Sequence, residues 1–162
     1  MHPVAILQLL VLLSVANGAP LLAKKLFGNA LAQPIDGGLR FFDRRPLFGA
    51  SKTIRGVAIS LVATTAAAPL VGLDLAIGAL VGATAMIGDL FSSFIKRRLD
   101  RPPSSQATGL DQIPEALFPP LACAAALSLT VADIIVIVAV FFVGEVWLSR
   151  VFYRLGLRDD PY

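Results

Sequence analysis

Long apolar runs and short polar segments alternate along the whole chain. Because a helix needs about 20 mostly apolar residues to cross a bilayer, each long run is expected to form one or two spans. A turn is marked by Pro69, Gly72 and Asp74 inside the second run, and Asp133 lies near the middle of the third. The pattern predicts an all-α, polytopic membrane protein with one domain over residues 1–162. Its five spanning helices are expected at about 4–23, 57–73, 75–95, 115–131 and 134–151.

Basic residues occur in the polar segments 24–55 and 96–113 and in the C-terminal tail. The turns near Asp74 and Asp133 carry none. Since Lys and Arg concentrate in cytoplasmic loops, both polar segments are predicted to be cytosolic. The N-terminus is then outside, the C-terminus is cytosolic, and the chain is a multi-pass protein of the cell membrane.

An alternative is that residues 1–19 form a cleaved signal peptide. A signal peptide has basic residues before its apolar run, but here Lys24 and Lys25 follow the run and none precedes it. The order of charge therefore favours a retained first helix with its N-terminus outside.

Composition agrees with a membrane protein, because 56% of the residues are hydrophobic and only 15% are charged. The chain has one cysteine, Cys123, and one histidine, His2. An intrachain disulfide and a His/Cys metal site are both excluded, and any metal must be held by oxygen ligands. Cys123 lies in an apolar run and is expected to be a small buried hydrophobe.

One carboxylate, Asp89, follows an apolar run inside a predicted span. On a helix, Asp89, Ser92, Ser93 and Lys96 form one polar stripe, because they are three, four and seven residues apart. A carboxylate at membrane depth costs roughly 2.5–3.5 kcal/mol on insertion scales, so it needs a partner. A divalent metal and the Lys96 ammonium are the two candidates.

The first polar loop ends in Lys52, Thr53 and Arg55, at the start of the second span. Free N–H groups and the helix dipole favour an anion there, which indicates a phosphate site. The alternative is that the cations anchor the span at the lipid headgroups. A P-loop is excluded, since Ser51 stands where that motif has glycine.

The second loop ends in Asp111, which has two interpretations. Its side chain could cap the fourth span, or it could face Asp89 across the cytosolic mouth of the bundle. Two carboxylates together with phosphate oxygens would suit Mg²⁺.

Two further polar residues lie within spans. Asn17 could bind substrate or bond to a neighbouring helix backbone. Glu145 could pair with Arg150, line the site, or handle a proton. Trp147 is expected in the interfacial belt.

Several motifs occur in order over nearly the whole chain: Asn17-Gly18-Ala19-Pro20, Pro34-Ile35-Asp36-Gly37-Gly38, Gly49-x-x-Lys52-Thr53-x-Arg55-Gly56, Gly88-Asp89, and Leu110-Asp111-Gln112. Together they resemble the CDP-archaeol synthase family, relatives of the CDP-diacylglycerol synthases. The resemblance implies transfer of a cytidylyl group from CTP to a lipid phosphate in the membrane, with Mg²⁺, giving a CDP-activated lipid and pyrophosphate. The lipid of that family is an unsaturated archaeal diether, digeranylgeranylglyceryl phosphate.

The resemblance also implies roles for particular residues. Asp89 and Asp111 would be the metal-site carboxylates, and they would act in catalysis together with Lys96. The nucleotide and the phosphates would be held by Lys52, Thr53, Arg55, Ser93, Lys96, Arg97 and Asn17. No nucleic-acid partner is expected, and assembly with further copies of the chain is left open.

Two departures from the family pattern concern the lipid. Arg44 stands where the family pattern has glycine. The segment 100–109 is less basic and richer in serine than is expected of archaeal members of that family. A diacyl phosphatidate is therefore the alternative substrate. A CDP-alcohol phosphotransferase would need several aspartates on one helix, and the third span offers only Asp89. A transporter or a non-catalytic scaffold are the remaining alternatives.

Overall fold

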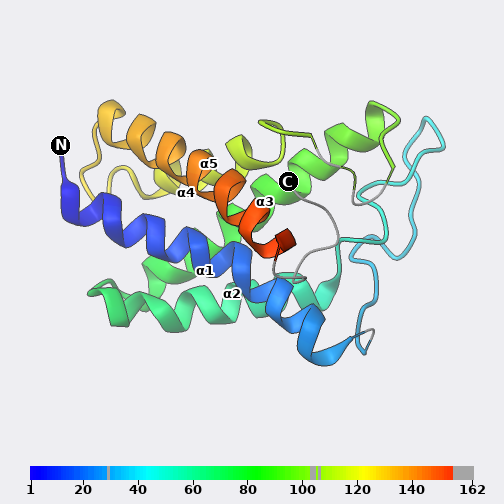
Figure 1. Cartoon of the computed structure of the whole chain (residues 1–162), viewed down its shortest axis with the longest axis horizontal. Coiled ribbons are helices and arrows are strands. Elements are labelled where there is room, and N and C mark those ends of the chain that lie inside the picture. The colour runs from blue at the N-terminus through cyan, green and yellow to red at the C-terminus, as the bar shows by residue number, and fades with distance from the viewer. Residues whose placement is uncertain (29, 103–104, 106, 155–162) are drawn as a thin grey trace.

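The computed structural model describes residues 1–28, 30–102, 105 and 107–154, and in these ranges it is helical apart from loops and two isolated β-bridges. The helices lie along the long axis of the molecule, and the loop between α1 and α2 extends beyond them at one end (Figure 1). The elements are α1 (Pro3–Phe27), α2 (Ile54–Ala67), the 3-10 helix η1 (Ala68–Val71), α3 (Leu75–Arg98), α4 (Gln112–Cys123) and α5 (Val131–Arg154).

Four helical segments of the described chain are long and apolar enough to cross a membrane. They are Pro3–Phe27, Ile54–Val71, Leu75–Arg98 and Val131–Ser149. The second combines α2 with η1 and stops at Gly72, whose φ of 80° is left-handed. Glycine adopts this conformation at little cost, which makes it a common helix terminator.

The helix at the predicted fourth span is shorter than the expected 115–131. α4 has 12 residues and contains Pro119 and Pro120, and it ends at Cys123. Proline supplies no N–H donor and its ring crowds the preceding turn, so a helix is hard to continue past this pair. Turns then lead the chain to Thr130 at the start of α5, with Leu127 and Leu129 packed against the core. The segment at the predicted fourth span is thus part helix and part irregular backbone.

Small residues bring α3 close to its neighbours. A Cβ on Gly78 would lie 2.6 Å from the Ala68 side chain, and one on Gly88 would lie 2.5 Å from the carbonyl oxygen of Pro114. Around these contacts the fully buried side chains include Leu9, Leu12 and Val81. α3 therefore lies between α2 and α4.

The end of the bundle where the chain begins is closed by Asp133. Its two carboxylate oxygens accept from the His2 backbone N–H and pair with His2 Nδ1, each at 2.9 Å. Its Oδ2 also accepts from the Thr130 N–H at 2.9 Å, and the Thr130 hydroxyl oxygen accepts from the Asp133 N–H at 3.3 Å, so the two residues form a reciprocal N-terminal cap for α5. Asp133 thus ties the start of α1 to α5, far from the loop-bearing end.

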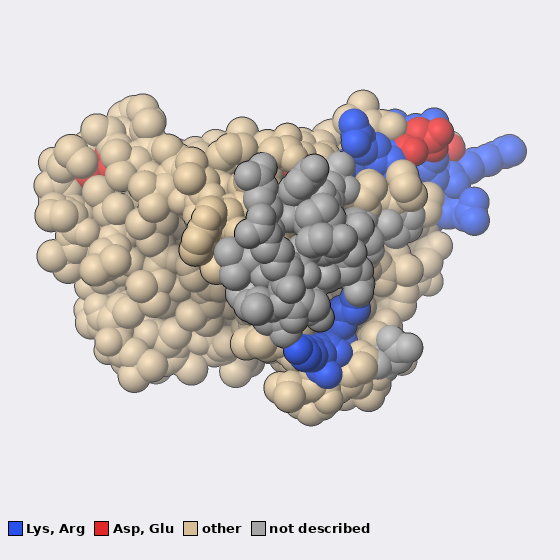
Figure 2. All heavy atoms as spheres, in the orientation of Figure 1, with Lys and Arg blue, Asp and Glu red and all other residues tan. Residues whose placement is uncertain are grey.

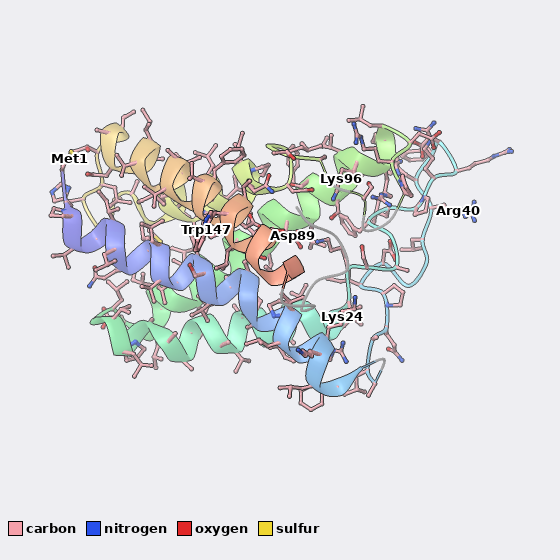
Figure 3. The ribbon with its side chains drawn as sticks, in the orientation of Figure 1. Met1, Lys24, Arg40, Asp89, Lys96 and Trp147 are labelled. Atoms are coloured by element: carbon pink, nitrogen blue, oxygen red, sulfur yellow. The ribbon has the colours of Figure 1, made fainter. Side chains whose placement is uncertain are left out.

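Charge is distributed unevenly over the surface. On the face drawn in Figure 2, the Lys and Arg side chains lie in the right half, and the described residues of the left half show few charged atoms. Figure 3 shows Arg40 and Lys96 toward this end, whereas Met1 lies at the opposite end. Large apolar side chains such as Leu22, Val62 and Val143 are more than half exposed. Such a surface suits contact with lipid rather than water.

Candidate active site at the basic end of the bundle

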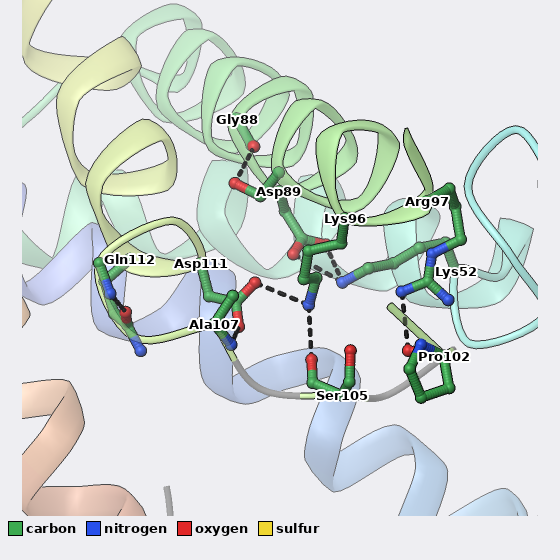
Figure 4. A network of polar contacts seen from close by, with 12 residues as sticks. Lys52, Gly88, Asp89, Lys96, Arg97, Pro102, Ser105, Ala107, Asp111 and Gln112 are labelled. Atoms are coloured by element: carbon green, nitrogen blue, oxygen red, sulfur yellow. Dashed lines mark hydrogen bonds and ion pairs between the residues drawn. The ribbon is translucent and has the colours of Figure 1, made fainter. Parts of the chain in front are cut away.

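The polar stripe of α3 faces the interior of the protein, as its spacing predicts. Ser92 and Ser93 are 1% and 2% exposed, and Lys96 is 7% exposed. Asp89 begins the stripe, and a quarter of its side chain remains exposed. In Figure 4 the side chains of Asp89 and Lys96 lie in one polar network with those of Lys52 and Asp111.

The partner of Asp89 in this structure is Lys52. Both carboxylate oxygens lie 2.6 Å from the Lys52 ammonium nitrogen. The backbone on either side of Lys52 is fixed, since the Ile35 N–H donates to the Lys52 carbonyl at 2.8 Å and the Ile54 N–H donates to the Gln33 carbonyl at 3.0 Å. Of the two expected partners, Lys96 is therefore not the cation that pairs with Asp89.

Lys96 pairs with Asp111 instead. Its ammonium nitrogen lies 2.7 Å from one Asp111 carboxylate oxygen and donates to the Ser105 carbonyl at 2.9 Å. The other Asp111 oxygen accepts from the Ala107 N–H at 2.9 Å. Asp111 makes no side-chain capping bond to α4. The side chain of Asp111 therefore does not cap α4 and instead pairs with Lys96, the last residue of the polar stripe that Asp89 begins.

The contact between Gly88 and the start of α4 brings a third carboxylate to this site. Glu115 is 5% exposed, and it interacts electrostatically with Asp89, Asp111 and Glu145. Glu115 is not among the residues that the sequence predicts for the site, although it follows Asp111 by four residues and so shares its helix face. Of the three alternatives for Glu145, its interaction with Glu115 favours a position that lines the site. The side chain of Arg150, with which Glu145 could pair, lies outside the described residues.

Arg97 is a buried cation with unused donors. It is 3% exposed, and its Nη2 donates to the Pro102 carbonyl at 2.9 Å. Nε and Nη1 are buried without an acceptor among the described residues. Because an unpaired buried donor is costly, these N–H groups favour an added anion.

Three of the expected binding residues do not bond to Asp89 or Asp111 in the described part of the chain. Thr53 caps α2, with its hydroxyl oxygen accepting from the Gly56 N–H at 3.1 Å. Arg55 Nη1 donates to the carbonyls of Gly28 and Ala30. Asn17 is half-buried, and its side chain makes no hydrogen bond to a neighbouring helix in the described part of the chain. Of its two alternatives, substrate binding is the one that stays a prediction.

The loop that presents Lys52 is held by a buried carboxylate, Asp36. It accepts from the N–H groups of Gly38 at 3.0 Å, Phe48 at 2.9 Å and Gly49 at 3.1 Å. Burial raises the pKa of Asp36, but these hydrogen bonds outweigh burial and hold the pKa below its usual value of 3.8. Asp36 is thus ionised at neutral pH and fixes the fold of the loop.

The same loop is docked on α3 through Arg98. The Arg98 guanidinium lies 4.9 Å from the ring centres of Phe41 and Phe94 and bonds to Asp43 at 2.6 Å. Stacking of a guanidinium on aromatic rings adds to the charge pair. This docking explains why residues 37 positions apart in the chain, Lys52 and Asp89, meet.

The donor chemistry of the site fits Mg²⁺. Asp89 and Asp111 offer carboxylate oxygens that are about one-quarter exposed. In the described ranges no three or more His, Cys, Asp or Glu side chains are grouped so as to hold a metal, so further ligands would be phosphate or water oxygens. His2 and Cys123 take no part, since His2 bonds to Asp133 and Cys123 lies in the core.

A family model and curated relatives of this chain all carry the same description. A family model described as CDP-archaeol synthase (CarS-like) matches residues 66–162. The CDP-archaeol synthase of Sulfurisphaera tokodaii is 32% identical over 154 residues, which cover 91% of this chain and 89% of that protein. The CDP-archaeol synthase of Pyrobaculum calidifontis is 33% identical over 153 residues, 91% of each chain.

The fold also matches a solved structure. That structure is described as an intramembrane enzyme for archaeal membrane lipids biosynthesis, and it superposes with a TM-score of 0.70 at 26% sequence identity. The match covers 86% of this chain and 91% of the solved one.

Proposed function

The chain belongs to the CDP-archaeol synthase family, and from this premise we propose that it transfers the cytidylyl group of CTP to an archaeol-type diether lipid phosphate in a Mg²⁺-dependent reaction. It is a nucleotidyltransferase, and its family supports a CTP-dependent activity on lipid. The products would be a CDP-activated lipid and pyrophosphate.

One observation carries the assignment of the site. Two lysine–carboxylate pairs, Lys52–Asp89 and Lys96–Asp111, lie together at the basic end of the bundle. Without substrate, each lysine neutralises its aspartate. A ligand that brings both a cation and phosphate groups can replace both partners, because the cation can bind the aspartates and the phosphates can bind the lysines. A metal–nucleotide complex is such a ligand, because its metal suits the carboxylates and its phosphates suit the lysines.

The reaction itself needs positioning and charge stabilisation more than acid–base chemistry. An oxygen of the lipid phosphate attacks the α-phosphorus of CTP, and the bond from that phosphorus to the bridging oxygen of the β-phosphate breaks. The attacking oxygen is already anionic, so no strong general base is required. The obstacle is repulsion between two anions, which Lys52, Lys96 and Arg97 would lower by binding their oxygens. Bound Mg²⁺, held by Asp89 and Asp111, would neutralise triphosphate charge.

We further propose that the site opens to the cytosol from the cell membrane. The basic residues of segments 24–55 and 96–113 flank the site, which supports a cytosolic position for this end. The chain would then cross five times, with the N-terminus outside. The fourth crossing would use α4 and the turns that follow it, since irregular backbone is tolerated at membrane depth when protein surrounds it.

The proposal is tested by measuring pyrophosphate release from CTP by the purified protein with Mg²⁺. Three conditions are compared: digeranylgeranylglyceryl phosphate, a diacyl phosphatidic acid, and no lipid. Release with the diether alone is expected. Release with the diacyl lipid would support cytidylyl transfer but show that the substrate is a diacyl lipid. Folded protein that releases no pyrophosphate with either lipid would contradict the proposed reaction.

A further inference from the structure

An apolar pocket opens between the end of α1 and the start of α2, at the loop-bearing end of the bundle. Its volume is about 420 Å³, within the usual range of small-ligand sites. The walls include Phe27 and Leu31 on one side and Ile54, Ala58 and Ile59 on the other. Phe27, Leu31 and Ile54 are each more than half exposed, so the pocket is bordered by apolar surface.

One charged residue, Arg55, belongs to the described lining of this pocket. Its Nη1 donates to the carbonyls of Gly28 and Ala30, which fixes the guanidinium against the wall formed by the end of α1. In the described part of the chain both bonds come from Nη1, so Nε and Nη2 remain for an anion. The pocket thus joins an apolar interior to a fixed cation.

The pocket lies close along the chain to the proposed catalytic site. Lys52, which pairs with Asp89, precedes the pocket residue Ile54 by two positions. Thr53 between them is extended and pairs with Pro34 in an antiparallel bridge. Two extended residues span only about 7 Å, so a single molecule can reach from the pocket to Lys52.

We propose that this pocket binds the part of one hydrocarbon chain nearest the headgroup of the lipid phosphate substrate, with Arg55 beside the phosphate or the glycerol oxygens. The inference rests on the proposed function for the identity of the lipid. A lipid phosphate combines the two features that the pocket selects, an anion and an apolar chain. A nucleotide offers the anion but would place polar groups against the apolar walls, at a cost.

Photolabelling tests this directly. The probe is a dialkylglycerol phosphate that carries a diazirine on one chain, close to the glycerol, and labelled peptides are identified by mass spectrometry. We expect label in residues 27–31 and 54–59, and excess unlabelled dialkylglycerol phosphate should displace it whereas the dialkylglycerol alcohol should not. Label spread evenly over the apolar surface, or displaced equally by the alcohol, would overturn the proposal in favour of ordinary bilayer contact.

A matched pair of variants gives a second readout. Ala58→Trp fills the pocket, whereas Ala66→Trp adds the same bulk at an exposed position two turns further along the same helical segment, outside the pocket. We expect Ala58→Trp to raise the KM for the lipid roughly tenfold, because about two methylene groups of the lipid chain would no longer be buried in the pocket. The KM for CTP should be unchanged. Equal lipid KM values in both variants would overturn the pocket assignment.

The two proposals fail in different ways. Wild-type protein that takes specific label in the pocket but releases no pyrophosphate would support the pocket and contradict the cytidylyl transfer. Wild-type protein that releases pyrophosphate with lipid but labels elsewhere would support the reaction and overturn the pocket.

Discussion

Gly88 of α3 and Pro114 of α4 lie so close that a Cβ at position 88 would come within 2.5 Å of the Pro114 carbonyl oxygen. This contact sets how near the two helices approach. The residue after Gly88 is Asp89, and the residue after Pro114 is the buried Glu115. The close approach therefore brings the carboxylate of α3 beside the start of α4, where Asp111 pairs with Lys96.

Gly88→Ala should separate these helices. The added methyl group meets backbone atoms rather than a flexible side chain, so we expect a loss of about 1–3 kcal/mol in stability and a large loss of activity. Thermal unfolding in detergent and lipid-dependent CTP turnover would be measured. Gly144→Ala is the control, since a Cβ there meets nothing within 4 Å and alanine favours a helix. Equal stability and activity in the two variants would refute this role of Gly88.

Asp36→Asn should loosen the loop that presents Lys52. Loss of the charge weakens three hydrogen bonds, and we expect the variant to be about 1–2 kcal/mol less stable at neutral pH. The folded-state pKa of Asp36 lies below its usual 3.8, so its stabilisation is complete above that pH and is lost as pH falls through the folded-state pKa. The difference in melting temperature between wild type and variant should be constant above about pH 4 and shrink only below it. A difference that instead grows on acidification would contradict this account.

The long helices follow from the sequence, because runs of about 20 apolar residues predict helices that can span a membrane. The stripe of Asp89, Ser93 and Lys96 was predictable from helical spacing alone. The short α4 was not expected, since hydropathy gave the length of the apolar run and ignored the effect of Pro119 and Pro120 on helix continuity.

The ion pairing was harder to predict. Lys96 was a natural partner for Asp89 on the same helix, but Lys52 pairs with it because Asp36 and Arg98 fold the first loop onto α3. Such long-range pairing depends on tertiary contacts that periodicity does not report. Glu115 was missed for the same reason, since only the Gly88 contact brings it to the site.

Asp89→Asn and Asp111→Asn should each abolish Mg²⁺-dependent turnover. Each change removes a carboxylate oxygen from the proposed metal site and leaves a lysine without its partner, so kcat should fall by about 10²–10³-fold or more. Both variants should remain folded, as judged by thermal unfolding in detergent.

The control for these variants is Asp74→Asn. Asp74 lies in the turn before α3 and its side chain makes no capping bond, so activity should be retained. Full activity in either Asp89→Asn or Asp111→Asn would refute the metal assignment, with those aspartates then acting only as partners of lysine.

Arg97→Lys should weaken nucleotide binding. Lysine keeps the charge but lacks the buried nitrogens Nε and Nη1, whose N–H groups have no acceptor in the described residues, so we expect the KM for CTP to rise roughly tenfold or more. Arg44→Lys in the first loop is the matched control and should leave the KM unchanged. A KM for CTP in Arg97→Lys equal to that of the control would show that Arg97 does not contact the nucleotide.

The central claim is that the cytidylyl group moves to the lipid, and the fate of individual phosphorus atoms tests it most directly. Purified protein with Mg²⁺ and digeranylgeranylglyceryl phosphate would be given CTP labelled with ³²P at either the α- or the γ-position. The account predicts that the α-label enters the lipid extract and that the γ-label appears only in pyrophosphate. A γ-label in the lipid extract, or no label in the lipid from either nucleotide, would contradict it.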